Sequence, residues 1–151
     1  MRHRDRNGGG VAIYVRNSIA VKRLALLKLT GAEWIWCKVQ GSTILVCTIC
    51  IDVPPLHAEL AEKLNESLAL AQTYSPDSII MLGDFNAGNT YLDSKLKNHS
   101  TILPYEILLR DTFWVSNMEQ LFNEPTRYSD VNNTANLRDL VFVSNDNIIS
   151  S

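Results

Sequence analysis

The residues best suited to chemistry lie together at the end of one apolar run. Asp84 and Asn86 follow the strand-like segment 79–82 and a glycine at position 83. Side chains two apart on an extended chain point to the same face, so a carboxylate and a carboxamide leave this strand side by side. An ionised aspartate orients or deprotonates water, and an asparagine amide donates to a phosphoryl oxygen. The pair therefore suits a phosphate site, and the plain alternative is a polar turn after a strand.

The elements that must position this pair follow from hydrophobic periodicity and from turn signals. The first third of the chain is rich in β-branched and aromatic residues, whereas one later segment carries leucines at helical spacing. A strand, a long helix and another strand in succession indicate an α/β fold. The pattern predicts strands at 11–15, 19–27, 33–39, 43–51, 78–82, 118–122 and 137–144, helices at 56–74 and 104–114, and polar loops at 87–101 and 124–136.

Length and composition indicate one ordinary globular domain. The chain has 151 residues, of which 46% are hydrophobic and 20% charged, and both shares are typical of globular proteins. Its longest apolar run, 44–51, is far shorter than the roughly 20 residues that cross a bilayer. The charged start of the chain does not have the pattern of a secretory signal. We therefore expect an intracellular protein, nuclear or cytoplasmic, that has no membrane partner.

The cysteines do not form a disulfide framework. Cys37, Cys47 and Cys50 are an odd set, and the last two resemble a C-x-x-C motif inside a strand-like run. A separation of three residues places their sulfur atoms on opposite faces of a strand, where they cannot readily share a metal or a disulfide. We therefore expect reduced, buried thiols with no disulfide partner, as in cytosolic or nuclear proteins.

Charge is distributed unevenly along the chain. The net charge is -2, but residues 1–28 hold seven Lys or Arg against one Asp, which gives +6 there and leaves -8 for the remainder. A basic edge attracts phosphate groups, as in nucleic-acid binding. The plainer explanation is a solvated terminus followed by a solvated hairpin.

Several short motifs together resemble a known family. The resemblance covers nearly the whole chain and depends on the order of the motifs, which are Gly8 to Tyr14, Pro54-Pro55, Gly83 to Asn86, Pro125 to Arg127 and Asp139-Leu140. The set resembles the endonuclease/exonuclease/phosphatase superfamily, and within it the endonuclease domains of non-LTR retrotransposons, which are similar to apurinic/apyrimidinic endonucleases. The resemblance implies a four-layer α/β sandwich, in which two mostly antiparallel or mixed β-sheets are flanked by helices. It also implies hydrolysis of phosphodiesters with Mg²⁺ or Mn²⁺ at one end of the sheets.

The resemblance implies roles for five residues. Asp84 matches the aspartate that positions or activates the attacking water, and Asn86 matches the asparagine that holds the phosphate. Asp139 matches an aspartate that orients the catalytic histidine of the family. Thr126 matches a threonine whose side chain borders the site. Arg127 is a candidate contact to the nucleic-acid backbone, with a surface salt bridge as the alternative.

Other parts of the family pattern have no counterpart in these residues. The chain starts after the strands that supply an asparagine and a metal-binding glutamate, and the 12 residues that follow Asp139 include no histidine. Asp52 stands where the family has an active-site tyrosine, and nothing marks Glu33 as a ligand. We therefore interpret residues 1–151 as a single incomplete domain that lacks the N-terminal strands and the Ser-Asp-His strand, and we assign no metal ligands.

These observations favour a metal-dependent phosphodiesterase domain. The expected activity is that of a DNA endonuclease of the non-LTR retroelement type, truncated and inactive as this chain, with DNA as partner and a reverse transcriptase as part of a larger polyprotein. Two alternatives stay open. One is a non-catalytic remnant that binds nucleic acid weakly or serves as an interaction domain. The other is a phosphatase of the same superfamily that acts on inositol or lipid phosphates.

Overall fold

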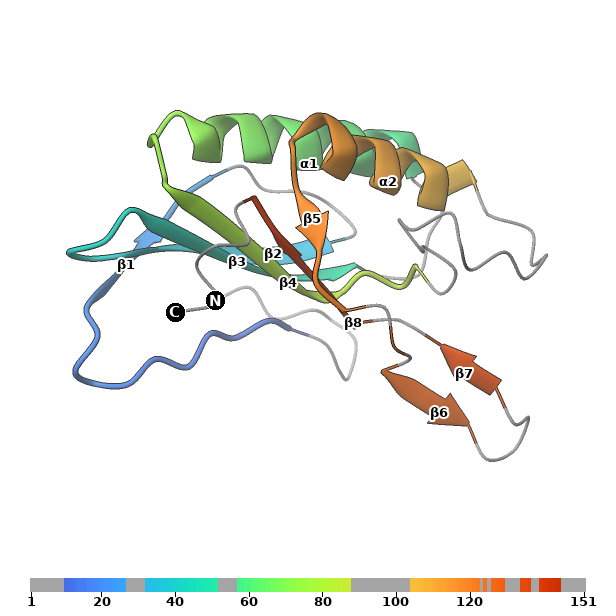
Figure 1. Ribbon diagram of the computed structural model, residues 1–151, viewed down its shortest axis with the longest axis horizontal. Coiled ribbons are helices and arrows are strands. Elements are labelled where there is room, and N and C mark those ends of the chain that lie inside the picture. Colours follow the sequence, from blue (N-terminus) through green and yellow to red (C-terminus); the bar gives the residue numbers. More distant parts are fainter. Residues whose placement is uncertain are drawn as a thin grey trace.

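The computed structural model describes residues 10–26, 32–51, 57–87, 104–122, 124, 126–129, 134–136 and 139–144. These residues form a six-stranded sheet, two helices and a separate two-stranded hairpin (Figure 1). The sheet contains β1 (Val21–Leu24), β2 (Ala32–Val39), β3 (Ile44–Ile51), β4 (Ser78–Asp84), β5 (Glu119–Gln120) and β8 (Asp139–Val143). The helices are α1 (His57–Gln72) and α2 (Pro104–Val115), and the hairpin consists of β6 (Arg127–Ser129) and β7 (Thr134–Asn136). The α/β class expected from the sequence is confirmed.

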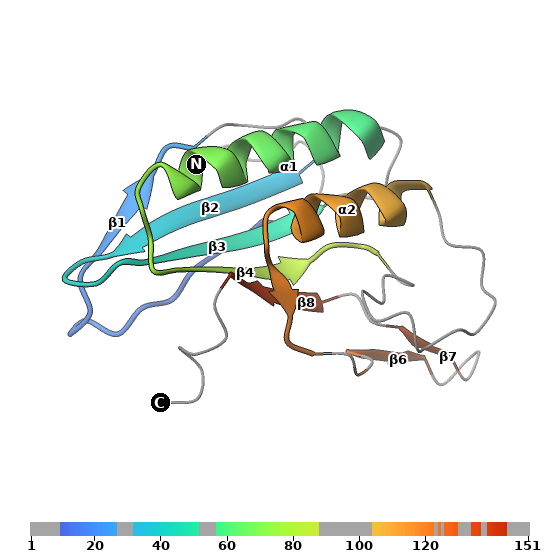
Figure 2. The same cartoon turned by 45° about the horizontal axis from the view of Figure 1, so that its top comes forward.

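The large sheet places β4 at its centre. Its strand order is β1-β2-β3-β4-β8-β5. Strands β3 and β4 run parallel because α1 carries the chain back between them, while the other neighbouring strands of this sheet are antiparallel. Both helices cover the same face of the sheet, as Figure 2 shows from a second direction. The end of β4 therefore has a neighbouring strand on each side.

Alternation along the strands distinguishes the helix-covered face from the opposite face. In β3, every second residue from Leu45 to Ile51 is buried, and the residues between them are half-buried. Trp36 of β2 lies on the covered face, because its indole N–H donates to Ser67 Oγ of α1 at 2.9 Å. Cys47 is the register partner of Trp36 and lies on the same face. The half-buried residues of β3 therefore point to the opposite face, which the helices do not cover.

Three phenylalanines fill the core next to the end of β4. Phe85, Phe113 and Phe142 are fully buried. The rings of Phe113 and Phe142 stack, with centroids 3.7 Å apart, and Phe85 meets both of them edge-on at 5.7 and 5.4 Å. Edge-to-face contacts of this kind stabilise a core beyond simple burial. The cluster thus anchors the residue that lies between Asp84 and Asn86.

The predicted elements agree with most observed ones to within a few residues, but the strand predicted at 11–15 is wrong. This segment is assigned to no strand, although Val11, Ile13 and Val15 are more buried than the two residues between them. The alternation of apolar residues therefore shows which side chains point toward the rest of the protein. A strand also needs a neighbouring backbone with which to exchange hydrogen bonds.

The polar loop predicted at 124–136 is also wrong, because this segment contains the β6–β7 hairpin. Its register pairs Arg127 with Asn136 and Ser129 with Thr134. The two strands pair with each other and belong to a separate sheet. Their sequences therefore show no alternation of apolar residues that would predict strands. The hairpin projects away from the large sheet beyond β8 (Figures 1 and 2).

Some sequence-based expectations remain untested. The part of the chain that the structure describes forms one large sheet rather than two, so the four-layer arrangement and the single incomplete domain stay predictions. No helix among the described segments is long and apolar enough to cross a membrane. Several residues named in the motifs above lie outside the described residues: Gly8, Gly9, Asp52, Pro54, Pro55 and Pro125.

The cysteines lie on both faces of the sheet, as the strand spacing predicts. Cys47 pairs in register with Trp36 and Met81 on the helix-covered face, whereas Cys50 lies on the opposite face. None of the three cysteines, all of which lie in the described segments, forms a disulfide, and Cys37 and Cys47 are buried. Burial raises the pKa of the Cys37 thiol, and the nearby Arg23 guanidinium partly opposes that rise.

We expect the free energy of unfolding to fall at alkaline pH because of Cys47. Burial raises the pKa of the Cys47 thiol well above 9.0, and Cys37 raises it further. The folded state therefore keeps a proton that the unfolded state loses above its pKa of about 8.5. Stability is then full below that pH and declines above it, by up to about 1.4 kcal/mol per pH unit.

Urea denaturation across this pH range under reducing conditions measures the slope of stability against pH. The Cys47→Ala variant should show a flatter slope, whereas Cys50→Ala, which changes a half-buried thiol, should keep the slope of the parent chain. Equal slopes in the parent chain and in Cys47→Ala would contradict the expectation.

Candidate active site

Strand β4 leaves no room for a side chain on its β3 side just before the site. Gly83 is the register partner of Ile49, and its φ of +143° is a conformation that other residues rarely adopt. A Cβ atom built on Gly83 would lie 1.9 Å from the Ile49 carbonyl oxygen. Only glycine fits here. Glycine therefore allows β4 to take this conformation directly before Asp84.

A short turn rather than an extended strand holds Asp84 and Asn86 together. The backbone N–H of Asn86 donates to Asp84 Oδ1 at 2.9 Å, which is a common way for aspartate to stabilise a turn. Asn86 has a φ of 48°, so the extended geometry assumed from the sequence is wrong at this residue. Its side-chain Nδ2 donates to the carbonyl oxygen of Ile51 at the end of β3. The turn thereby ties the ends of two parallel strands together.

Asp139 lies directly opposite Asp84 in the sheet. The two residues are register partners in the antiparallel β4–β8 pair. In the same pair, Ser144 N–H donates to Ile79 O at 3.0 Å, and hydrogen-bonded pairs alternate with non-bonded ones along an antiparallel ladder. Counting from Ser144, Asp84 and Asp139 form a non-bonded pair, the class in which side chains lie closest. Residues distant in sequence thus present two facing carboxylates.

The sheet also aligns Glu33 and Cys50 with this pair. Glu33 of β2 is the register partner of Cys50 in β3, and Cys50 is the partner of Asp84. Glu33 lies two strands from Asp84, a Cα separation of about 10 Å. No feature of the sequence marks Glu33, and only the register of β2 and β3 places it in this row.

Thr126 contacts Asp139 directly, while Arg127 does not join the row. The backbone N–H of Asp139 donates to Thr126 Oγ1 at 3.1 Å. Arg127 follows in the chain and begins β6, the first strand of the hairpin. The structure therefore brings Asp84, Asn86, Thr126 and Asp139 into one hydrogen-bonded and paired set, and it places Arg127 at the base of the neighbouring hairpin.

Two carboxylates of this row, those of Asp84 and Asp139, face each other. Across the described ranges, no group of three or more His, Cys, Asp or Glu side chains is placed to hold a metal ion. Mg²⁺ keeps several waters and is commonly held by one or two carboxylates, so Asp84 and Asp139 supply only part of an octahedral shell.

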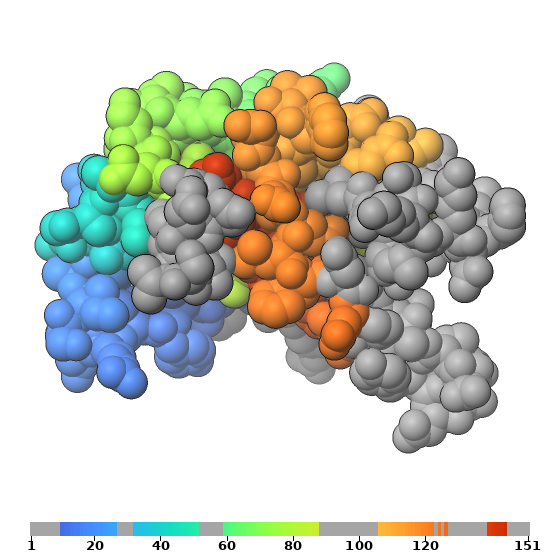
Figure 3. Space-filling view, viewed as in Figure 1, coloured from blue at the N-terminus to red at the C-terminus, as the bar shows by residue number. Residues whose placement is uncertain are grey.

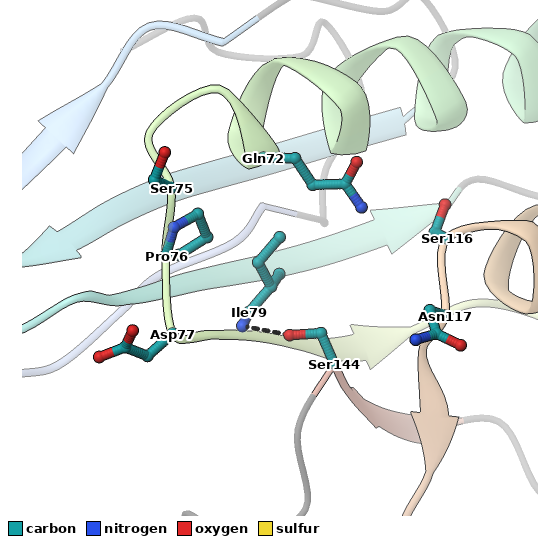
Figure 4. A pocket seen from close by; sticks show the side chains of 8 residues that line it. All are labelled: Gln72, Ser75, Pro76, Asp77, Ile79, Ser116, Asn117 and Ser144. Carbon is teal, nitrogen blue, oxygen red and sulfur yellow. Dashed lines mark hydrogen bonds between the residues drawn. The ribbon is translucent and has the colours of Figure 1, made fainter.

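A polar pocket of about 330 Å³ lies at the other end of β4. Figure 4 shows the end of α1, the turn before β4 and the turn after α2 around it, with Ile79 N–H donating to Ser144 Oγ at 2.8 Å. None of the predicted site residues lines this pocket, which separates it from the candidate active site. Its lining consists of Gln72, Ser75, Pro76, Asp77, Ile79, Ser116, Asn117 and Ser144.

Comparison with known proteins identifies the family. Residues 2–150 match the model of the Endonuclease/Exonuclease/phosphatase family. The chain belongs to this family. Enzymes of the Endonuclease/Exonuclease/phosphatase family generally depend on a divalent metal ion, and the family resemblance expected from the sequence is confirmed. No curated protein matches the chain in sequence.

Solved structures with the same fold include a retrotransposon domain. The endonuclease domain of TRAS1, a telomere-specific non-LTR retrotransposon, is similar with a TM-score of 0.56 at 15% identity. The match covers 89% of this chain and 59% of the TRAS1 domain, so the chain spans less than two thirds of that relative. An endonuclease/exonuclease/phosphatase family protein from Bacteroides thetaiotaomicron matches at 19% identity over 75% of this chain and 41% of its own, with a TM-score of 0.36. The TRAS1 likeness supports the family fold.

Proposed function

We propose that this chain is part of a DNA endonuclease of the non-LTR retroelement type that hydrolyses phosphodiester bonds. The observation that carries the proposal is the meeting of Asp84, Asn86 and Asp139 at the end of the central strand. The family resemblance implies that the three positions act on the water, the phosphate and the catalytic histidine, respectively. Likeness to the TRAS1 endonuclease domain supports nucleic acid, rather than inositol or lipid phosphates, as the substrate class.

The proposed role of Asp84 follows from its fixed orientation. One carboxylate oxygen accepts the Asn86 backbone N–H, which limits rotation of the side chain. A carboxylate held in this way aligns or deprotonates an attacking water. Asn86 is anchored through Nδ2 to Ile51 O, and we assign its carboxamide to holding the phosphate. Asp139 orients a general acid or base, which is a histidine elsewhere in the family.

The proposed partner is DNA, and the proposed cofactor is Mg²⁺ or Mn²⁺. Arg127 begins the hairpin that projects beyond β8, near the end of the sheet that carries Asp139 (Figure 2). A cationic residue there suits the phosphate backbone of a duplex, whose contacts weaken as salt concentration rises. The metal requires ligands beyond Asp84 and Asp139, and an arrangement with a reverse transcriptase in one polyprotein belongs to the same proposal.

A second candidate function is a non-catalytic nucleic-acid-binding or interaction domain. It is favoured by the small set of carboxylates at the site, since the described segments contain no group of three or more His, Cys, Asp or Glu side chains placed to hold a metal. We propose that this describes the 151-residue chain when it acts alone.

Nicking of supercoiled plasmid in the presence of Mg²⁺ or Mn²⁺ tests both candidates. We expect background nicking by the chain alone, and measurable nicking by a chimera in which TRAS1 supplies the strands outside the matched region. In that chimera, Asp84→Asn should reduce the rate by about 10²- to 10⁴-fold, because the charged form of the carboxylate is needed to act on water.

Asp77→Asn is the matched control for this variant. Asp77 precedes β4 at its other end and accepts a hydrogen bond from Thr43 Oγ1, which an asparagine can also accept. The control should leave nicking unchanged. Undiminished nicking by the Asp84→Asn chimera would refute the role of Asp84, and Asp84-dependent nicking by the chain alone would refute its inactivity.

A further inference from the structure

The backbone N–H of Asp139 is not used by the sheet. Asp139 and Asp84 form a non-bonded pair of the β4–β8 ladder, in which neither backbone N–H points to the opposite strand. The Asp139 N–H instead donates to Thr126 Oγ1 at 3.1 Å. Thr126 thus provides the hydrogen-bond acceptor that the β4–β8 ladder does not provide for the N–H of Asp139, the residue opposite Asp84.

The same bond closes the base of the hairpin. Strands β6 and β7 occupy residues 127–129 and 134–136, so Thr126 and Asp139 lie on either side of the hairpin in sequence. The hairpin belongs to a separate sheet and stands away from the large one (Figure 1). The Thr126–Asp139 bond is therefore a direct link between the hairpin base and the first residue of β8.

We propose that Thr126 is a positioning residue that couples the β6–β7 hairpin to Asp139. Its hydroxyl oxygen fixes the start of β8, so a displacement of the hairpin changes the placement of Asp139 relative to Asp84. The consequence for DNA cleavage rests on the proposed function, since it requires the hairpin to touch nucleic acid. The coupling itself depends only on the hydrogen bond and the topology.

The test measures amide hydrogen exchange by NMR in the 151-residue chain. Thr126→Val removes the acceptor at nearly constant shape, and Thr126→Ser keeps it. We expect exchange at Asp139 N–H to quicken by about 2- to 10-fold in Thr126→Val, the factor that one ordinary hydrogen bond contributes, and to stay unchanged in Thr126→Ser. The Ser144 N–H, bonded to Ile79 O in the same strand pair, is the reference amide and should not change.

A break in the hairpin tests the coupling without DNA. Ala135 pairs with Tyr128, and Ala135→Pro disrupts strand β7. This change should quicken exchange at Asp139 in the parent chain and have no further effect in Thr126→Val. Equal Asp139 exchange in the parent and Thr126→Val chains, or independent addition of the two effects, would overturn the proposal.

Titration with a short DNA duplex separates this proposal from the proposed function. Shifts at hairpin amides that extend to Asp139 in the parent chain, but stop at the hairpin in Thr126→Val, support both. An absence of hairpin shifts counts against DNA contact by the hairpin, and the exchange data then decide the coupling alone.

Discussion

Replacing Gly83 with alanine should destabilise the protein by more than about 4 kcal/mol, a cost that only severe core defects reach. The added Cβ would meet the Ile49 carbonyl oxygen at 1.9 Å, and the φ of +143° is itself unfavourable for a side chain. Because the obstacle is backbone in the centre of the sheet, no side-chain rotation relieves it. Chemical denaturation measures the loss, and failure of the variant to fold is the extreme form of the same result.

Gly41→Ala is the control that separates the collision from backbone strain. Gly41 also has a positive φ, +77°, but a Cβ built there meets nothing within 4 Å. We expect this variant to cost only about 1–2 kcal/mol, the usual penalty for a side chain in a left-handed conformation. Similar losses for the two variants would show that a Cβ atom at position 83 does not collide with the Ile49 carbonyl oxygen.

Truncating Phe85 to alanine should cost about 3–5 kcal/mol, the range for a large aromatic residue removed from a core. Phe85 is fully buried and makes two edge-on contacts, with Phe113 and Phe142. The cavity would lie directly next to the turn that joins Asp84 to Asn86, so the turn should loosen as well. Denaturation reports the stability loss, and faster exchange at Asn86 N–H reports the loosened turn.

Phe122→Ala provides the comparison for this truncation. Phe122 is 58% exposed and follows β5, and the orange segment that contains β5 lies on the face of the molecule shown in Figure 3. Substitutions at such surface positions usually change stability by no more than about 0.5 kcal/mol. A small effect at Phe85, similar to that at Phe122, would contradict the placement of Phe85 in the core.

The facing carboxylates at the end of β4 lower the stability of the sheet. Asp84 and Asp139 are directly opposite, and like charges in such a pair destabilise a sheet. Natural proteins commonly give up some stability where a site serves a function. The pair is therefore consistent with a functional site at this strand end.

Local sequence patterns predicted most of the fold, but not the parts that depend on pairing with a neighbouring strand. Leucines at helical spacing predicted α1, and apolar runs predicted β2, β3 and β4, because burial of one face requires apolar residues at regular intervals in the sequence. The three-residue strands of the hairpin pair only with each other, so their sequences show no periodic pattern of apolar residues. Residues 11–15 show an alternating apolar pattern but are assigned to no strand, because a strand also needs a neighbouring strand.

The sequence by itself determined the family, the α/β class and the positions of Asp84 and Asn86 at a strand end. Only the tertiary structure decided that Asp139 faces Asp84, that Glu33 and Cys50 share their row, and that Thr126 binds the Asp139 backbone. The physical reason is register. Which residues of distant strands lie opposite one another depends on how all the strands pack together, and no single segment of the chain carries that information.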